Sequence, residues 1–287
     1  MDPALQEGLL SPPALAVLGL CIGSFLNVVI HRLPLMLERG WKIDSAQMLG
    51  LDPTKTPAIG APLSLSRPRS QCPKCGHAIA WHENIPLLGY LRLGGRCSAC
   101  KTRISPRYPI VELATALLFA AIGWRFGAQP AALLWCGFAA VLIALTGIDW
   151  DTTLLPDDLT LPLLWAGLVA AALGWTLPLT QALWGAVAGY LSLWSVYWAF
   201  KLATGKEGMG HGDFKLLAAL GAWLGAQMIL PIVLGASVLG AVVGLAMKAS
   251  GALREGRYVP FGPFLAGSGL VVLLAGSARV LGWLGWA

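Results

Sequence analysis

Two aspartates, Asp149 and Asp213, have the clearest potential for acid–base chemistry in this sequence. Asp149 follows the apolar run at residues 131–148, and Asp213 begins another apolar run at 213–229. An ionisable side chain next to hydrocarbon is costly and is usually retained for a function. Two carboxyls that converge on one site can activate a water molecule, one as base and the other as acid. We therefore take this pair as the candidate catalytic residues.

The same aspartates also admit a structural explanation. Asp213 closes a Gly-x-Gly-Asp motif at residues 210–213, where the glycines let the backbone approach a partner closely. Its side chain could equally cap the helix that follows. Further along the turn after Asp149, either Asp157 or Asp158 is well placed to cap the next helix. Capping does not exclude catalysis, so the motif alone leaves both roles open.

Four cysteines form two CxxC pairs with 21 residues between them. Two such pairs can together present the four thiolates of a tetrahedral zinc site. Two disulfides are the alternative, which a reducing cytoplasm would disfavour. Four thiolates leave no open coordination position, so we predict a structural rather than a catalytic zinc ion. The predicted ligands are Cys72, Cys75, Cys97 and Cys100.

The composition is that of a membrane protein. Hydrophobic residues make up 56% of the chain and charged residues only 12%, well below the charged share of ordinary globular proteins. The net charge of +6 could suggest nucleic acid, but 12 of the 20 Lys and Arg residues lie between positions 32 and 107. A basic cytoplasmic loop explains that clustering better. We therefore expect a lipid bilayer, and no nucleic acid, as the partner.

The apolar runs predict an all-α polytopic membrane protein with about eight transmembrane helices and a small zinc-stabilised cytoplasmic domain. Eighteen of the 20 basic residues fall on one side of this arrangement, which the positive-inside rule makes cytoplasmic. Both aspartates then lie at the cytoplasmic boundary. Pro231 marks the weakest division, so seven spans stay an alternative. The expected spans are 12–31, 109–126, 131–148, 159–177, 180–201, 213–229, 230–248 and 262–284.

We divide the chain into a first transmembrane helix with an entry motif (1–33), a cytoplasmic zinc-binding domain (34–106) and a transmembrane helical core (107–287). The entry motif contains Ser24 and Asn27 inside an apolar run. Small and amide side chains in such a run favour close helix packing and hydrogen bonds between helices.

In their order and spacing, these motifs resemble those of the type IV prepilin peptidases, membrane enzymes of pilus and type II secretion systems. The matching pieces are the entry motif at residues 23–27 with Arg32 and Pro34, the double CxxC, Ile148-Asp149 with Leu-Pro-Asp at 155–157, and the Gly-x-Gly-Asp at 210–213. The last is also the signature of presenilin-type intramembrane aspartyl proteases. The resemblance extends from about residue 20 to residue 265.

The resemblance implies a bifunctional enzyme of the bacterial inner membrane. It would cut the basic leader from prepilins and pseudopilins at the cytoplasmic face, with Asp149 and Asp213 as the catalytic dyad. It would then methylate the new terminal amine with S-adenosylmethionine. No Rossmann-like Gly-x-Gly-x-x-Gly motif follows a strand, so we assign no ligands to this cofactor, and the sequence gives no oligomeric state.

Two other classes of function compete with this interpretation. A proton-coupled transporter would be expected to place its acids near the middle of the bilayer, often within inverted repeats. A zinc-stabilised scaffold for a secretion complex would function without either aspartate. The predicted position of both acids at one face, and the lack of a visible repeat, favour the enzyme.

Overall fold

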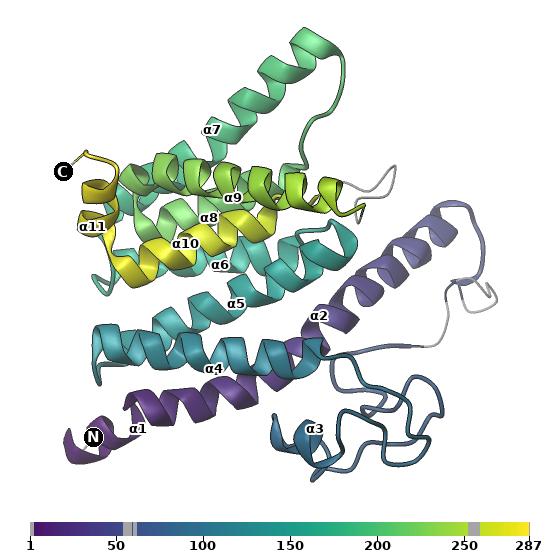
Figure 1. Cartoon of the computed structure of the whole chain (residues 1–287). Coiled ribbons are helices and arrows are strands. Elements are labelled where there is room, and N and C mark those ends of the chain that lie inside the picture. The colour runs from purple at the N-terminus through teal and green to yellow at the C-terminus, as the bar shows by residue number, and fades with distance from the viewer. Residues whose placement is uncertain (1–2, 54–58, 60–61, 252–258, 287) are drawn as a thin grey trace. The chain divides into compact units, whose positions relative to one another are not determined.

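The computed structural model describes residues 3–53, 59, 62–251 and 259–286. These residues are mainly helical (Figure 1), and their β-structure is limited to two isolated bridges, Gln71–Ala78 and Arg96–Arg103. The chain forms two compact units, Met1–Ala140 and Val141–Ala287, with the division inside one helix. Three of the basic residues used for the topology prediction, Lys55, Arg254 and Arg257, lie outside the described residues.

The first unit is built on two helices that pack along each other, α2 and α4 (Figure 1). Glycines permit this close approach: a Cβ at Gly19 would lie 2.7 Å from Ala116 Cα, and a Cβ at Gly23 would lie 2.7 Å from Glu112 Cα. The helices of this unit are α1 (Pro3–Leu9), α2 (Pro12–Met48), α3 (Leu88–Arg92), α4 (Arg107–Phe126) and the first part of α5 (Pro130–Thr152).

Helix α2 is longer than the span expected at 12–31. Its 37 residues correspond to about 55 Å at 1.5 Å per residue, against about 30 Å of bilayer hydrocarbon. The helix continues past Pro34, so our sequence-based boundary between residues 33 and 34 falls inside a continuous helix. We call residues 34–48 the α2 extension.

The second unit surrounds one buried helix, α8. All residues from Leu216 to Trp223 are buried, because α6, α7, α9 and α10 each pack against this helix. The α7 and α8 backbones come so close that a Cβ at Gly185 would meet the Gly221 carbonyl oxygen. The helices of this unit are α6 (Asp157–Ala172), α7 (Leu179–Thr204), α8 (His211–Leu224), the short 3-10 helix η3 (Ala226–Met228), α9 (Ile229–Ala249), α10 (Gly262–Ala275) and α11 (Ser277–Trp283), together with the end of α5.

Within the described parts of the chain, four helical segments are long and apolar enough to cross a membrane: α2, α4, α5 and Ala226–Ala249. A fifth is possible if α10 and α11, which are bent by 108°, form one span. The other expected spans correspond to α6, α7 and α8. Helices α6 and α8 are short, with 16 and 14 residues, and α7 carries Trp and Tyr side chains that lower its hydropathy. The count of eight therefore stays a prediction.

The division between the expected sixth and seventh spans is present, but its cause differs from the one we expected. Helix α8 ends at Leu224, and Gly225 follows with a φ of +89°, a conformation that favours glycine. Pro231 lies inside α9 instead, where a proline near a helix start is tolerated.

Candidate active site and cysteine cluster

Both candidate catalytic aspartates are buried at the ends of helices. Asp149 lies in the last turn of α5 and is 4% exposed, whereas Asp213 lies in the first turn of α8 and is 8% exposed. The residue that caps α8 is Gly210, and there is no side-chain capping hydrogen bond. The cap role that we left open for Asp213 is therefore wrong, and its burial needs another explanation.

The two carboxyls lie near enough to interact electrostatically. Each has one buried oxygen without a hydrogen-bond partner, Oδ2 of Asp149 and Oδ1 of Asp213. Buried polar atoms are almost always paired, so each exception needs an explanation, such as a catalytic role or a bound water molecule. The arrangement is chemically suited to holding a water molecule between an acid and a base.

Two glycines and a leucine bring the aspartate-bearing segments together. A Cβ at Gly212, next to Asp213, would lie 2.7 Å from Leu155 Cβ. A Cβ at Gly262, the first residue of α10, would lie 2.5 Å from Asp149 Oδ2 and 3.1 Å from Leu155 Cδ1. The neighbourhood of the aspartates thus includes the start of α10. Gly262 was not among the predicted site residues, although its place between two prolines just before an apolar run was a signal.

An ion pair joins the starts of α6 and α8. Lys215 Nζ lies 2.7 Å from each carboxylate oxygen of Asp157. The residue that caps α6 is Pro156, without a side-chain capping bond, so the prediction that Asp157 or Asp158 caps this helix is wrong. The Lys215 ammonium holds the Asp157 carboxylate instead.

Aromatic rings pack around His211 within the Gly-x-Gly-Asp motif. The His211 ring centroid lies 5.0 Å from that of Tyr197 and 5.3 Å from that of Phe214. Lys201 Nζ donates to the Tyr197 hydroxyl at 3.1 Å and pairs with Glu207 at 2.9 Å. These contacts fix the connection between α7 and α8 immediately before Asp213.

The four loop cysteines converge in the first unit. All four Sγ atoms lie within 4.8 Å of one another, and none of the cysteines forms a disulfide in the described structure. The Sγ atoms of Cys72 and Cys100 are 3.8 Å apart, and those of Cys75 and Cys97 are 3.9 Å apart. A zinc tetrahedron with Zn–S bonds of about 2.3 Å has edges of about 3.8 Å, so the donor set fits zinc.

The two CxxC segments fold as matching turns, which we call knuckle 1 (residues 71–78) and knuckle 2 (residues 96–103). In knuckle 1, Gly76 N–H donates to the Cys72 carbonyl at 2.9 Å, and in knuckle 2, Lys101 N–H donates to the Cys97 carbonyl at 3.1 Å. Gly76 and Lys101 both have positive φ, 71° and 56°. An isolated bridge closes each knuckle. The repeated CxxC spacing was visible in the sequence, and the structure adds the matching bridges and the positive φ at Gly76 and Lys101.

Backbone donors lower the pKa of the first thiol in each knuckle, whereas burial and the neighbouring thiols raise the pKa of Cys75 to about 11. The N–H groups of Cys75 and Lys74 lower the pKa of the Cys72 thiol to about 6. The backbone N–H of Cys100 lowers the pKa of the Cys97 thiol in the corresponding turn. Thiolates are the form that binds metal, so each knuckle favours the ligating state of its first cysteine.

A polar contact joins the two knuckles beside the cysteines. His77 Nε2 lies 3.1 Å from Ser98 Oγ and 3.4 Å from Glu83 Oε2. The Glu83 carboxylate also accepts from the Ala80 N–H at 2.9 Å. Ser98, the Ala80 N–H and His77 together lower the pKa of Glu83 to about 2, so this side chain is a stable anion at neutral pH.

Helix contacts at the entry motif connect the membrane helices to the segment between α2 and α4 that carries the four cysteines, which we call the cysteine loop. Asn27 Nδ2 donates to the Tyr108 carbonyl of α4 at 3.0 Å, which confirms the expected hydrogen bond between helices. Arg32 Nη1 donates to the carbonyls of Ser64 and Leu65. The buried Glu112 carboxylate of α4 accepts from the Leu87 N–H at 2.8 Å.

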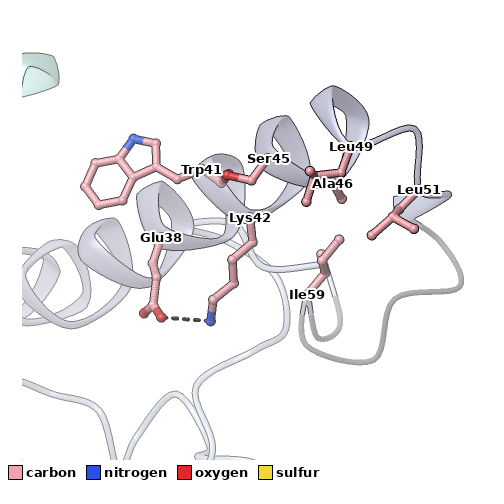
Figure 2. Close-up of a pocket in the computed structure, with 8 residues that line it drawn as sticks. All are labelled: Glu38, Trp41, Lys42, Ser45, Ala46, Leu49, Leu51 and Ile59. Carbon is pink, nitrogen blue, oxygen red and sulfur yellow. Dashed lines mark hydrogen bonds and ion pairs between the residues drawn. The ribbon is translucent and has the colours of Figure 1, made fainter.

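A pocket of about 400 Å³ lies against the α2 extension, and neither candidate aspartate lines it. Figure 2 shows the pocket, with the Glu38 carboxylate paired to Lys42 Nζ at 2.8 Å. Most of the remaining lining is apolar. The lining residues are Glu38, Trp41, Lys42, Ser45, Ala46, Leu49, Leu51 and Ile59.

Two family models match the chain. Residues 17–126 match the bacterial peptidase A24 N-terminal domain, and residues 136–245 match the type IV leader peptidase family. The first match contains the entry motif and the four cysteines. The second contains both candidate catalytic aspartates.

Curated relatives match most of the chain. A protein of Pseudomonas aeruginosa named prepilin leader peptidase/N-methyltransferase is 53% identical over 262 residues, which cover 91% of this chain and 89% of that protein. A protein of the same name from Stutzerimonas stutzeri is 52% identical over 273 residues, covering 94% of this chain and 93% of the relative. No solved structure matches this chain significantly.

Proposed function

The chain belongs to the type IV leader peptidase family, and on that premise we propose that it cleaves the leader from prepilins and pseudopilins and then methylates the new N-terminal amine. Its relatives carry both activities in their names. Family membership favours the enzyme over the two alternatives that the sequence left open, a proton-coupled transporter and a zinc-stabilised scaffold. The observation that carries the peptidase assignment is the pair of buried, interacting carboxyls at Asp149 and Asp213.

The proposed dyad works by sharing one proton. Two close carboxyls do not ionise together easily, so the pair holds a single proton across its working range. The ionised aspartate takes a proton from water while the water oxygen attacks the scissile carbonyl carbon. The protonated aspartate donates to the carbonyl oxygen. The carbon–nitrogen bond then breaks, and a proton passes from the dyad to the leaving amine.

We place this site at the cytoplasmic face of the bacterial inner membrane. Support comes from the location of both aspartates at helix ends and from the basic residues concentrated between positions 32 and 107. The eight-span topology remains our proposal for the bilayer-embedded chain, with α6, α7, α8 and the α10–α11 pair completing the set. The proposed division is a first helix and entry motif (1–33), a cytoplasmic domain (34–106) and a helical core (107–287).

We propose that Cys72, Cys75, Cys97 and Cys100 hold one zinc ion with a structural role. The Sγ distances and the lowered pKa of the Cys72 and Cys97 thiols support this assignment. A zinc ion would supply a covalent-like crosslink between the two knuckles. The cysteine loop between α2 and α4 needs such a link because its described part holds little regular structure, chiefly the five-residue helix α3 and two isolated bridges.

The proposed methyl donor is S-adenosylmethionine, whose sulfonium supplies an electrophilic methyl group. The pocket in Figure 2 does not fit this cofactor well, because its Glu38 and Lys42 charges already neutralise each other. The cofactor's own ammonium and carboxylate would compete for those partners. We therefore derive no step through this pocket and assign no residue to cofactor binding.

The direct test uses purified full-length protein in detergent with a prepilin substrate. The product mass is measured with and without S-adenosylmethionine. We expect loss of the leader in both samples and the further mass of one methyl group only when the cofactor is present. An intact prepilin in both samples would contradict the proposal.

A further inference from the structure

The start of α10 supplies one backbone donor beside the candidate active site. Pro263 has no N–H, and the N–H groups of Phe264 and Leu265 both donate to the Phe261 carbonyl. The backbone of Gly262, the first residue of α10, lies directly beside the Asp149 carboxyl, since a Cβ on it would be 2.5 Å from Asp149 Oδ2. The first amides of a helix attract a carboxylate both as donors and through the helix dipole. One end of α10 is thus directed at Asp149.

A side chain at position 262 would crowd the Asp149 carboxyl and Leu155. The ideal Cβ at position 262 would lie 2.5 Å from Asp149 Oδ2 and 3.1 Å from Leu155 Cδ1. Gly262 is buried, and its φ lies outside the left-handed region. The requirement is therefore for room beside the carboxyl rather than for an unusual backbone conformation. Asp149 Oδ2, the atom that lies against Gly262, is also the one without a hydrogen-bond partner.

We propose that Gly262 is a positioning residue of the peptidase, which holds the Asp149 carboxyl in place for reaction with water. This inference rests on the proposed function. It adds the Pro-Phe-Gly-Pro segment at residues 260–263 to the two aspartate segments as a third part of the site. Because Gly262 acts through Asp149, its loss should slow the chemical step more than it weakens prepilin binding.

The experiment compares Gly262→Ala with Gly267→Ala in the full-length protein. Both substitutions add one methyl group to α10, but nothing lies within 4 Å of a Cβ at Gly267. We expect Gly262→Ala to lower kcat for leader cleavage by about 10- to 100-fold, the cost of misplacing a reacting group by roughly 1 Å. KM should change little, and Gly267→Ala should match the wild type. Equal kcat values for the two variants would overturn the inference.

A stability measurement covers the case in which Gly262→Ala folds poorly. The thermal unfolding midpoint is measured for Gly262→Ala in the wild-type and Asp149→Ala backgrounds. Removing the carboxyl removes the nearest obstacle to the new Cβ, so we expect a smaller loss of stability in the Asp149→Ala background. An equal loss in both backgrounds would assign the glycine to packing against Leu155 and overturn the positioning role. Inactivity of the wild-type protein would instead refute the proposed function itself.

Discussion

Lys215 Nζ lies 2.7 Å from both carboxylate oxygens of Asp157. Lys215 is two residues after Asp213, and Asp157 begins the helix that follows the Asp149 turn. The ion pair therefore joins the two chain segments that carry the candidate dyad. Its side chains are 30% and 53% exposed, and partly exposed pairs contribute at most about 1 kcal/mol.

From this pair we predict that Lys215→Met reduces leader cleavage only a few-fold and lowers the unfolding free energy by about 1 kcal/mol or less. The charge-exchanged double variant, Lys215→Asp with Asp157→Lys, should recover part of the loss. Cleavage rates and chemical unfolding of the purified variants test this. If cleavage disappeared while stability stayed normal, Lys215 would act on the substrate rather than on Asp157.

The two glycines of the Gly-x-Gly-Asp motif should respond differently to alanine. A Cβ at Gly212 would lie 2.7 Å from Leu155 Cβ, whereas a Cβ at Gly210 would meet only Asp213 Oδ2, at 4.0 Å. We predict that Gly212→Ala displaces Asp213 and loses about 10- to 100-fold in cleavage rate, and that Gly210→Ala keeps most activity. Initial rates on one prepilin decide between them, and the reverse order of sensitivity would contradict the geometry.

Zinc should bind at one ion per chain. We predict that Cys72→Ser destabilises the cysteine loop first and lowers activity as a consequence, because a closed four-thiolate site leaves no position for substrate. Elemental analysis gives the metal content, and limited proteolysis reports the loop. Cys136→Ser, at a buried cysteine outside the cluster, is the control for zinc content. Metal-free wild-type protein, or two disulfides found under reducing conditions, would refute the site.

The two activities should be separable. Methyl transfer needs a neutral amine and a bound methyl donor but no carboxylate dyad. We predict that Asp213→Asn still methylates a pilin supplied already cleaved, whereas changes in residues 23–27 or in the cysteine loop impair methylation more. Transfer of label from S-adenosylmethionine to mature, unmethylated pilin measures this. A folded Asp213→Asn protein that transfers no label would mean that both reactions share one site.

Local spacing predicted the cysteine cluster well, because each CxxC pair needs only its own turn to present two thiols. The contact between knuckles through His77, Ser98 and Glu83 could not be predicted, since it depends on how two separate turns meet. Contacts between residues distant in sequence also determined whether an aspartate caps the start of a helix. Asp157 or Asp158 was expected to cap α6, but neither does, and a lysine distant in sequence holds Asp157.

The ends of the membrane helices likewise could not be predicted from the sequence alone. Hydropathy located the apolar segments, but their ends depend on turns that composition does not reveal. Gly225 ends the α8 segment early, and α2 continues through Pro34 to Met48. Gly262 escaped notice because its role arises only where the start of α10 meets Asp149.

The central claim is that Asp149 and Asp213 form the peptidase dyad, and the most direct test is leader cleavage by Asp149→Asn and Asp213→Asn. An amide keeps the shape of the side chain but cannot exchange the proton, so each variant should insert, fold and lose cleavage. Asp151→Asn and Asp158→Asn, at exposed positions in the same region, are the matched controls and should retain activity. Substantial cleavage by either purified dyad variant would remove that aspartate from the mechanism, and equal loss in all four would make this region structural.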